Sequence, residues 1–379
     1  MLEKQPIPYK LSPPREAQYR EFTNEPPAHI PIDRLGVLVE NVPYPFSEVV
    51  GIDMSGIDGC HYGVKNIFPS IFYRYETQGL RVGEGIFYPT PDKAIAGGTT
   101  TTNAGTAMVI AAERFGYEPL MVIPDNLPRA RYRFMEDHNV HLIKTRNYAK
   151  EMPDAVKALI AQNPERLARG EKVYMFEDHS VRNADITVEV MSKTIGSQVV
   201  KALGHLEGLA LVVAMGNGSS IQAIGQEVRM HIPESKVVAA ESIAYGGGYN
   251  MFAAKNHLPT YRDLLGIDPG HPELMKVFRA YGSNAPIHVK LPLQQKSIDE
   301  VVTDYALYLY DEVLAAYQKL GMGNAYSIFV ESLPNYDRLP KSLYERYGNT
   351  SLANILIASQ YVEQGLPAAA VLYDSRINY

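Results

Sequence analysis

Residues 209–232, LALVVAMGNGSSIQAIGQEVRMHI, carry the most informative local pattern in the chain. The stretch starts with a continuous apolar run of the kind found in strands that are buried on both faces of a sheet. Closely spaced glycines then predict a tight turn, and two serines precede apolar residues at helical spacing. The pattern predicts a strand, a glycine-rich turn and a helix, which is the repeating unit of parallel α/β sheets.

The same alternation of strand and helix patterns continues on both sides of this stretch. Short apolar runs bounded by turn residues predict strands at 85–89, 119–124, 140–145, 236–242 and the start of 368–379. Apolar residues at helical spacing predict helices at 102–117, 130–139, 154–168, 188–204 and 299–321. The fold class is therefore expected to be α/β, with parallel-type sheets flanked by helices on both faces.

The composition is that of an ordinary globular protein of 379 residues, for which two domains are the expectation. The net charge is −6 with scattered Lys and Arg residues, which argues against a nucleic-acid partner. No apolar run approaches the ~20 residues that a membrane span needs, which argues against a membrane partner, and the polar start lacks the apolar core of a secretory signal. Cys60 is the only cysteine, so we expect a reducing compartment and a cytoplasmic protein.

The first 45 residues hold nine of the 26 prolines. Because proline lacks the amide donor that helices need, this composition favours an extended, partly irregular arm over helices. Two interpretations stay open for such an arm: it wraps the body or a partner subunit, or it is a loosely ordered tail.

The turn formed by Gly216, Asn217, Gly218, Ser219 and Ser220 is a candidate anion site. Glycines let backbone N–H groups converge, and the start of the helix adds positive potential, so the turn suits a phosphate group. The alternative is a tight strand-to-helix turn in which the hydroxyl groups only cap the helix. The pattern matches neither the dinucleotide fingerprint nor the lysine-bearing phosphate loop, so neither dinucleotides nor nucleoside triphosphates are implied.

A second polar turn consists of Thr99, Thr100, Thr101, Thr102 and Asn103, between a predicted strand and a predicted helix. It offers hydroxyl groups, a side-chain amide and backbone donors at a helix N-terminus, a combination that can hold a small carboxylate. A capped helix with a polar lead-in is the alternative.

Three stretches in one order give the chain a family resemblance. They are HYGVKNIFPSIFYRYETQGLRVGEG at 61–85, the threonine–asparagine turn followed by FGYEPLMVIPDNLPRARYRFMEDHNVHLIKT at 115–145, and GNGSS at 216–220. This order resembles the fold-type II pyridoxal-phosphate-dependent enzymes, the group of cysteine synthase and the tryptophan synthase β-subunit, over roughly residues 40–245. The resemblance implies a two-domain tryptophan synthase β-like fold, pyridoxal 5'-phosphate as the cofactor, an amino-acid substrate and a homodimer.

The resemblance also implies roles for individual residues. Lys65 follows a short run that matches the one before the family's Schiff-base lysine, so it is the expected catalytic residue. Asn103 matches the asparagine beside the ring hydroxyl of the cofactor, and Thr99–Thr102 match the loop that holds the substrate carboxylate. The turn at 216–220 matches the glycine-rich phosphate loop of the family.

Lys65 has a chemical reason to react. A free lysine is protonated at neutral pH, but burial among aromatic residues and a nearby cationic field would lower the pKa of its amine and free the lone pair. The same amine can then act as a general base at the α-carbon of the substrate. Lys93 and Lys193 are the other candidates for this role.

In the family, the group near the pyridine nitrogen follows a C-terminal strand, and the sequence offers Asp374 and Ser375 there. A serine would leave the nitrogen neutral, which suits β-elimination, whereas an aspartate would keep it protonated and permit racemase- or aminotransferase-like chemistry. We expect Ser375 and keep Asp374 as the alternative. The acidic and histidine residues at 137–138 and 177–179 lack the partners of a metal site, so no metal is expected.

Four threonines replace the family's Ser-Gly in the carboxylate loop, so the substrate contact differs from that of cysteine synthase. The expected reaction is α,β-elimination or β-replacement, through an external aldimine and an aminoacrylate, catalysed by a lyase or transferase. Its expected substrate carries a β leaving group, as serine, O-activated serine and cysteine derivatives do. The alternatives are a dehydratase, racemase or deaminase of a specialised pathway, and a catalytically silent relative that binds a ligand.

The expected organisation has three parts. Residues 1–44 form a proline-rich arm that contributes to the larger domain. Residues 45–175 form the smaller domain, with the Schiff-base lysine and the Thr/Asn loop. Residues 176–379 form the larger domain, with the phosphate loop, and the cofactor lies in the cleft between the two.

Overall fold

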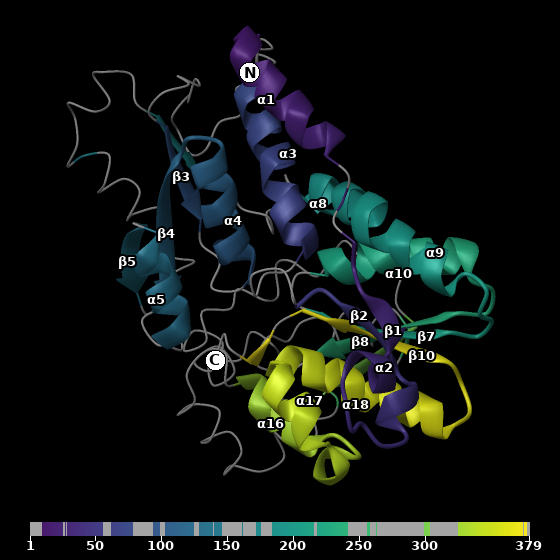
Figure 1. The fold of residues 1–379 in the computed structure, drawn as a ribbon. Helices are drawn as coiled ribbons and strands as arrows, with labels where there is room; N and C mark the ends of the chain where they lie inside the picture. Colours follow the sequence, from purple (N-terminus) through teal and green to yellow (C-terminus); the bar gives the residue numbers. More distant parts are fainter. Residues whose placement is uncertain are drawn as a thin grey trace.

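The structure is a computed structural model that describes residues 10–25, 27, 29–55, 62–78, 94–98, 103–124, 129–138, 140–145, 161, 172–175, 184–215, 218–241, 256–257, 263, 299–303, 325–373 and 375–376. Two sheets organise these residues (Figure 1). Within these ranges, every helix is too short or too polar to cross a membrane.

The larger sheet has six strands in the order β1-β2-β10-β7-β8-β9. Their bounds are β1 Ile32–Arg34, β2 Val50–Asp53, β10 Ala368–Leu372, β7 Ala210–Ala214, β8 Lys236–Glu241 and β9 Glu300–Thr303. β1 pairs antiparallel with β2, whereas the pairs from β2 to β9 are all parallel. The carboxyl ends of β2, β10, β7, β8 and β9 therefore share one edge of the sheet, where open parallel sheets bind ligands.

Strand β7 shows why helices cover this sheet on both faces. Leu211 and Val213 join one apolar cluster, Ala210 and Val212 join the other, and all four side chains are fully buried. The continuous apolar run in the sequence predicts this burial. Helix α18 packs on one face, with α16 and α17 beside it, and α10 packs on the other, with α8 and α9 (Figure 1). The bounds are α8 Ala184–Met191, α9 Ser197–Leu203, α10 Ser219–His231, α16 Ala325–Ser332, α17 Lys341–Arg346 and α18 Asn349–Glu363.

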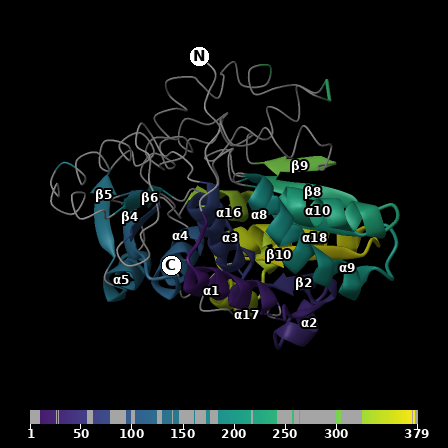
Figure 2. The ribbon, with the colours of Figure 1, turned by 90° about the horizontal axis from the view of Figure 1, so that it is seen from above.

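The smaller sheet has the order β5-β4-β3-β6, and all its pairs are parallel. It lies to one side of the larger sheet (Figures 1 and 2). The bounds are β3 Ala94–Gly98, α4 Asn103–Arg114, β4 Glu118–Pro124, α5 Arg129–Asp137, β5 His141–Thr145 and β6 Lys172–Met175. The α/β class predicted from the sequence is confirmed, and the antiparallel strand β1 makes the larger sheet mixed.

Helix α3, Tyr62–Gln78, connects the two parts of the molecule. It packs against α4 on one side and α8 on the other. Phe68 and Phe72 of α3 belong to the apolar cluster that also includes residues of α4, α8, α10 and one face of the larger sheet. Arg74 adds two hydrogen bonds of 2.7 and 2.8 Å to the carboxylate of Asp185 in α8. Helix α3 therefore contacts a helix of each part: α4 beside the smaller sheet and α8 beside the larger sheet.

The expectation of an extended arm at the start of the chain is wrong for Pro13–Asn24, which form helix α1. Pro13 and Pro14 occupy the first helical positions, where a missing N–H removes no intrahelical hydrogen bond. Tyr19 of α1 is buried and stacks on Phe115, with 4.8 Å between ring centroids. Proline content predicts irregular backbone only where proline falls inside an element.

Two further expectations need correction. The helix predicted at 299–321 is wrong at its start, because Glu300–Thr303 form β9, where β-branched residues favour a strand. Strand β3 at Ala94–Gly98 has no counterpart among the predicted strands, because its small residues resemble a loop. The strand predicted at 85–89 and nearly all of the helix predicted at 154–168 lie outside the described residues.

Candidate functional site

Gly218, the residue directly before α10, has a backbone conformation that suits an anion site. Gly218 has φ +87°, in the left-handed region that favours glycine, and it caps α10. Its carbonyl accepts a hydrogen bond from the Gln222 N–H at 3.0 Å. The Ser220 hydroxyl donates to Met191 Sδ at 3.7 Å, which holds the start of α10 against α8. Helix α10 thus begins at the carboxyl edge of the larger sheet, with the positive end of its dipole at this turn.

Helices α3 and α4 lie side by side, and α1 fixes their carboxyl ends (Figure 1). Arg15 of α1 donates to Glu76 of α3 at 2.6 and 3.0 Å, and to the Phe115 carbonyl just beyond α4 at 2.6 Å. The two helices therefore run in the same direction. Lys65 lies eleven residues before Glu76, and Asn103 lies eleven residues before the end of α4. At 1.5 Å per residue, both main-chain positions are about 16 Å from the anchored ends, so Lys65 and Asn103 share one end of the helix pair.

Pro69 gives α3 an irregularity next to Lys65. A proline inside a helix lacks the N–H that would bond to the carbonyl four residues earlier, which is the Lys65 carbonyl. Interior prolines also bend helices. Pro69 is buried. The direction of the main chain at Lys65 therefore depends on how this ring packs.

Ser375 lies just beyond β10, at the same edge of the larger sheet as the turn before α10. Its main chain forms an antiparallel bridge with Tyr347. The adjacent Arg376 donates to Asn349 Oδ1, at the first residue of α18, at 2.8 Å. The segment after β10 is therefore tied to the end of α17 and the start of α18.

Several predicted site residues lie wholly or partly outside the described structure. For Lys65 and Asn103 the main chain is described, and the side chain is not. Lys93 and the predicted site residues Thr99, Thr100, Thr101, Thr102, Gly216, Asn217 and Asp374 lie outside the described residues. The roles assigned to all these residues stay predictions. Lys193, one alternative to Lys65, has a side chain that is 71% exposed and pairs with Glu189 one helical turn earlier.

The sequence motifs do not single out two buried carboxylates at the carboxyl edge. Asp53, the last residue of β2, is 4% exposed, and Glu241, the last residue of β8, is fully buried. A buried carboxylate is costly unless hydrogen bonds compensate for the lost water, and Asp53 accepts such bonds from Ser55 and Tyr347. The signal that could have found them is an acidic residue directly after an apolar run, as in VGID and VVAAE.

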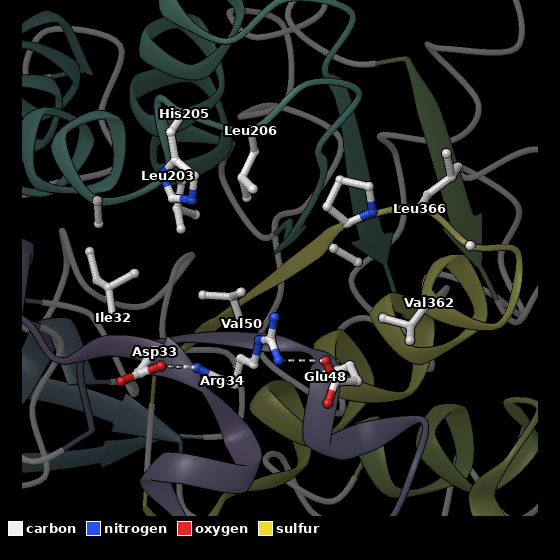
Figure 3. A pocket seen from close by; sticks show the side chains of 14 residues that line it. Ile32, Asp33, Arg34, Glu48, Val50, Leu203, His205, Leu206, Val362 and Leu366 are labelled. Carbon is white, nitrogen blue, oxygen red and sulfur yellow. Dashed lines mark hydrogen bonds and ion pairs between the residues drawn. The ribbon is translucent and has the colours of Figure 1, made fainter.

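A separate pocket of about 440 Å³ lies at the opposite, amino edge of the larger sheet (Figure 3). Val50 and Ala368, the first residues of β2 and β10, line it together with Leu203. Arg34 and Glu48 form an ion pair of 3.0 Å beside the apolar lining. Because the glycine-rich turn and the segment after β10 lie at the carboxyl edge, this pocket is separate from the candidate site.

Fold and site together define a class of protein: an α/β protein with a mixed six-stranded sheet and a parallel four-stranded sheet. It has a helix N-terminus suited to a phosphate group, and two neighbouring helices carry a lysine and an asparagine in their first turns. A family model described as pyridoxal-phosphate dependent enzyme matches residues 73–302. This match covers more than half of the chain, and the chain belongs to that family. The predicted cofactor, pyridoxal phosphate, is thereby confirmed. The match begins after Lys65 and includes both polar turns.

Solved structures confirm the fold-type II, tryptophan synthase β-like architecture. O-ureido-L-serine synthase is 16% identical, with a TM-score of 0.55 over 92% of this chain and 90% of that one. An O-acetylserine-dependent cystathionine β-synthase from Helicobacter pylori is 14% identical, with a TM-score of 0.55 over 93% of this chain and 94% of that one. A lysine-to-alanine mutant of O-ureido-L-serine synthase with bound O-ureido-L-serine is 17% identical, with a TM-score of 0.58 over 93% and 89%. At these identities the likeness concerns the fold.

The described residues fit the phosphate end of this cofactor. The left-handed Gly218 lets the chain approach a ligand closely, because it carries no side chain. The helix that follows contributes the backbone N–H groups of its first turn, which are donors that phosphate oxygens accept from.

Proposed function

We propose that the protein catalyses α,β-elimination or β-replacement on an amino acid with a leaving group at its β-carbon, as a lyase or a transferase. The observation that carries the proposal is the common end of α3 and α4, which Lys65 and Asn103 share at the level of the main chain. Membership of the pyridoxal-phosphate family supports it. Two of the similar structures are named for O-substituted serines, which supports serine, O-activated serine or cysteine derivatives as substrates.

In this proposal each residue holds one group or moves one proton. Lys65 binds the cofactor through its amine, and after release the same amine removes the proton from the α-carbon of the substrate. Thr99–Thr102 bind the substrate carboxylate, and Asn103 lies beside the ring hydroxyl of the cofactor. When bound, the cofactor supplies an electron sink for the negative charge at the α-carbon. Ser375 leaves the ring nitrogen neutral, which favours loss of the β leaving group.

We propose that the site lies between a smaller domain, residues 45–175, and a larger domain, residues 176–379, with residues 1–44 contributing to the larger one. One strand in the range 45–175, β2, belongs to the larger sheet, where it pairs with β10. We also propose a homodimer, on the strength of the family resemblance, and light scattering by the purified protein would measure it.

Borohydride reduction of the purified holoenzyme tests the role of Lys65. We expect reduction to fix the cofactor on the peptide that contains Lys65, and Lys65→Ala to lose both the fixed cofactor and turnover. Lys193→Ala is the control, because that lysine is exposed and should affect neither. Cofactor fixed to another peptide in the wild type would contradict the assignment.

The products formed from O-acetylserine test the reaction. Without an added nucleophile we expect pyruvate and ammonia, and with sulfide we expect a β-substituted amino acid, both detectable by mass spectrometry. The alternative racemase chemistry would instead exchange the α-proton with solvent deuterium and leave the β-substituent in place. Exchange without loss of that substituent would therefore contradict the proposal.

A further inference from the structure

Asp53, at the carboxyl end of β2, is the common acceptor of a buried hydrogen-bond network. Its side chain is 4% exposed. Oδ1 accepts hydrogen bonds from the Ser55 N–H at 3.0 Å and the Ser55 hydroxyl at 2.5 Å. Oδ2 accepts from the Tyr347 hydroxyl at 2.9 Å and from Arg346 Nη2 at 3.1 Å. A carboxylate this deeply buried needs such donors in place of water, so they hold the groups around it in fixed positions.

This network joins the strand before Lys65 to the segment that contains Ser375. Asp53 pairs in parallel register with Leu372 of β10, and the Met54 N–H donates to the Leu372 carbonyl at 2.9 Å. Three residues beyond Leu372, the main chain of Ser375 is bridged to Tyr347. Tyr347 is also the residue whose hydroxyl binds Asp53. A single tyrosine therefore connects the carboxylate at the end of β2 to Ser375.

The contacts of Tyr347 hold both its main chain and its side chain in place. Its side chain is fully buried, and its N–H donates to the Leu343 carbonyl at 3.0 Å. Arg346 lies over its ring, with the guanidinium carbon 5.4 Å from the centroid. Burial is the main cause that raises the pKa of the Tyr347 hydroxyl well above its ordinary value, and the negative charge of Asp53 raises it further. The hydroxyl therefore stays protonated and donates to Asp53 throughout the neutral range.

We infer that Tyr347, held by Asp53, is a positioning residue that fixes Ser375 at the pyridine nitrogen of the cofactor. The inference rests on the proposed function, in which Ser375 faces that nitrogen. A hydroxyl must lie within hydrogen-bond distance of its partner, so a displacement of a few tenths of an ångström weakens the interaction. The bridge to Tyr347 sets the main chain of Ser375, and the hydroxyl bond to Asp53 sets Tyr347.

Three substitutions in the full-length holoenzyme test the inference. Tyr347→Phe removes the hydroxyl and keeps the buried ring, so the variant is expected to fold. Ser375→Ala is the reference for loss of the nitrogen contact. Tyr19→Phe is the matched control, because Tyr19 is also buried and donates to a buried carboxylate, Glu76, at 2.7 Å, but belongs to α1. The readouts are the pH dependence of the visible absorption band of bound cofactor, the cofactor dissociation constant and the melting temperature.

We expect Ser375→Ala and Tyr347→Phe to shift the band in the same direction and to weaken cofactor binding about 2- to 10-fold, the effect of one lost hydrogen bond. Tyr19→Phe should lower the melting temperature and leave the band unchanged. A shift in Ser375→Ala without one in Tyr347→Phe overturns the positioning role and leaves the proposed function intact. An equal shift in Tyr19→Phe also overturns that role, because general destabilisation would then explain the effect. An unshifted band in Ser375→Ala removes the assignment of Ser375 and this inference with it, and a wild type that binds no cofactor removes the proposed function itself.

Discussion

Gly218 combines a backbone requirement with a proposed role in binding. Its φ of +87° is a conformation that costs an L-residue about 1–2 kcal/mol. We expect Gly218→Ala to lower the free energy of unfolding by about that amount and to weaken cofactor binding, because relief of the strain would displace the first N–H groups of α10. Urea unfolding and cofactor titration measure the two effects separately.

Gly365 provides a matched control for this substitution. It has φ +80°, follows α18 at the amino edge, and a Cβ there would meet no atom within 4 Å. Gly365→Ala should therefore cost similar stability without changing cofactor affinity. If Gly218→Ala also bound the cofactor as tightly as the wild type, the turn would be structural and not a phosphate site.

Helix α3 contains a proline, Pro69, in its interior. Replacing this proline should raise stability and lower turnover. Proline in a helix interior is about 3 kcal/mol less favourable than alanine. Because the buried ring also contributes apolar contacts, we expect Pro69→Ala to raise the free energy of unfolding by about 1–2 kcal/mol. The restored bond to the Lys65 carbonyl would straighten α3 and misplace Lys65, so turnover should fall about tenfold or more.

Pro13→Ala is the control for Pro69→Ala. Pro13 occupies the first position of α1, where proline removes no helical hydrogen bond, so turnover should stay at the wild-type rate. Stopped-flow or steady-state kinetics and thermal unfolding measure the pair. Unchanged turnover in Pro69→Ala would mean that the main-chain direction at Lys65 does not depend on the proline.

The elements that sequence predicts well are those whose local pattern agrees with their final environment. The run that ends at Met215 is apolar because β7 is covered on both faces, and the glycines that follow match an observed positive φ at Gly218. The same reasoning fails where local signal and environment differ. β3 consists mostly of alanine and glycine, and its pairing with neighbouring strands makes it a strand, whereas β9 lies at the start of a pattern that predicts a helix.

The candidate site is predictable in its order along the chain and not in its supporting contacts. Lys65, Asn103 and the 216–220 turn follow from motifs, and the shared end of α3 and α4 agrees with that grouping at the level of the main chain. Asp53 and Tyr347 are about 290 residues apart in sequence, and their contact depends on the pairing of β2 with β10. No local pattern encodes such a pairing.

At the scale of the whole molecule, Glu76 of α3 binds both α1 and the residue that precedes β4 of the smaller sheet. It is 1% exposed and accepts hydrogen bonds from Arg15, Tyr19 and Tyr117. The guanidinium of Arg15 also lies 5.3 Å from the ring centroids of both tyrosines. Burial, with the neighbouring Tyr117 and Glu76, raises the pKa of the Tyr19 hydroxyl far above its ordinary value.

This raised pKa predicts how stability depends on alkaline pH. Below the unfolded value, about 10, the contribution of Tyr19 is fully present. Above it the unfolded chain loses a proton that the folded protein keeps, so stability falls by about 1.4 kcal/mol per pH unit from this residue. Because this slope is reached only well above the unfolded pKa, we expect Tyr19→Phe to reduce the loss of stability between about pH 10 and 11 by about 1 kcal/mol in urea unfolding. The exposed Tyr44→Phe variant should keep the wild-type slope, and equal slopes in all three proteins would contradict the prediction.

Strand β10 lies between β2 and β7, although β2 ends at Asp53 and β10 begins only at Ala368. During synthesis on the ribosome, β2 emerges early and must wait for a partner that is translated several hundred residues later. The strands of the smaller sheet all lie between residues 94 and 175, so that unit can be completed first. Before β10 is synthesised, the nascent chain exposes apolar side chains of β2 and β7 that β10 later helps to cover. Exposed apolar surface of this kind is what chaperones bind.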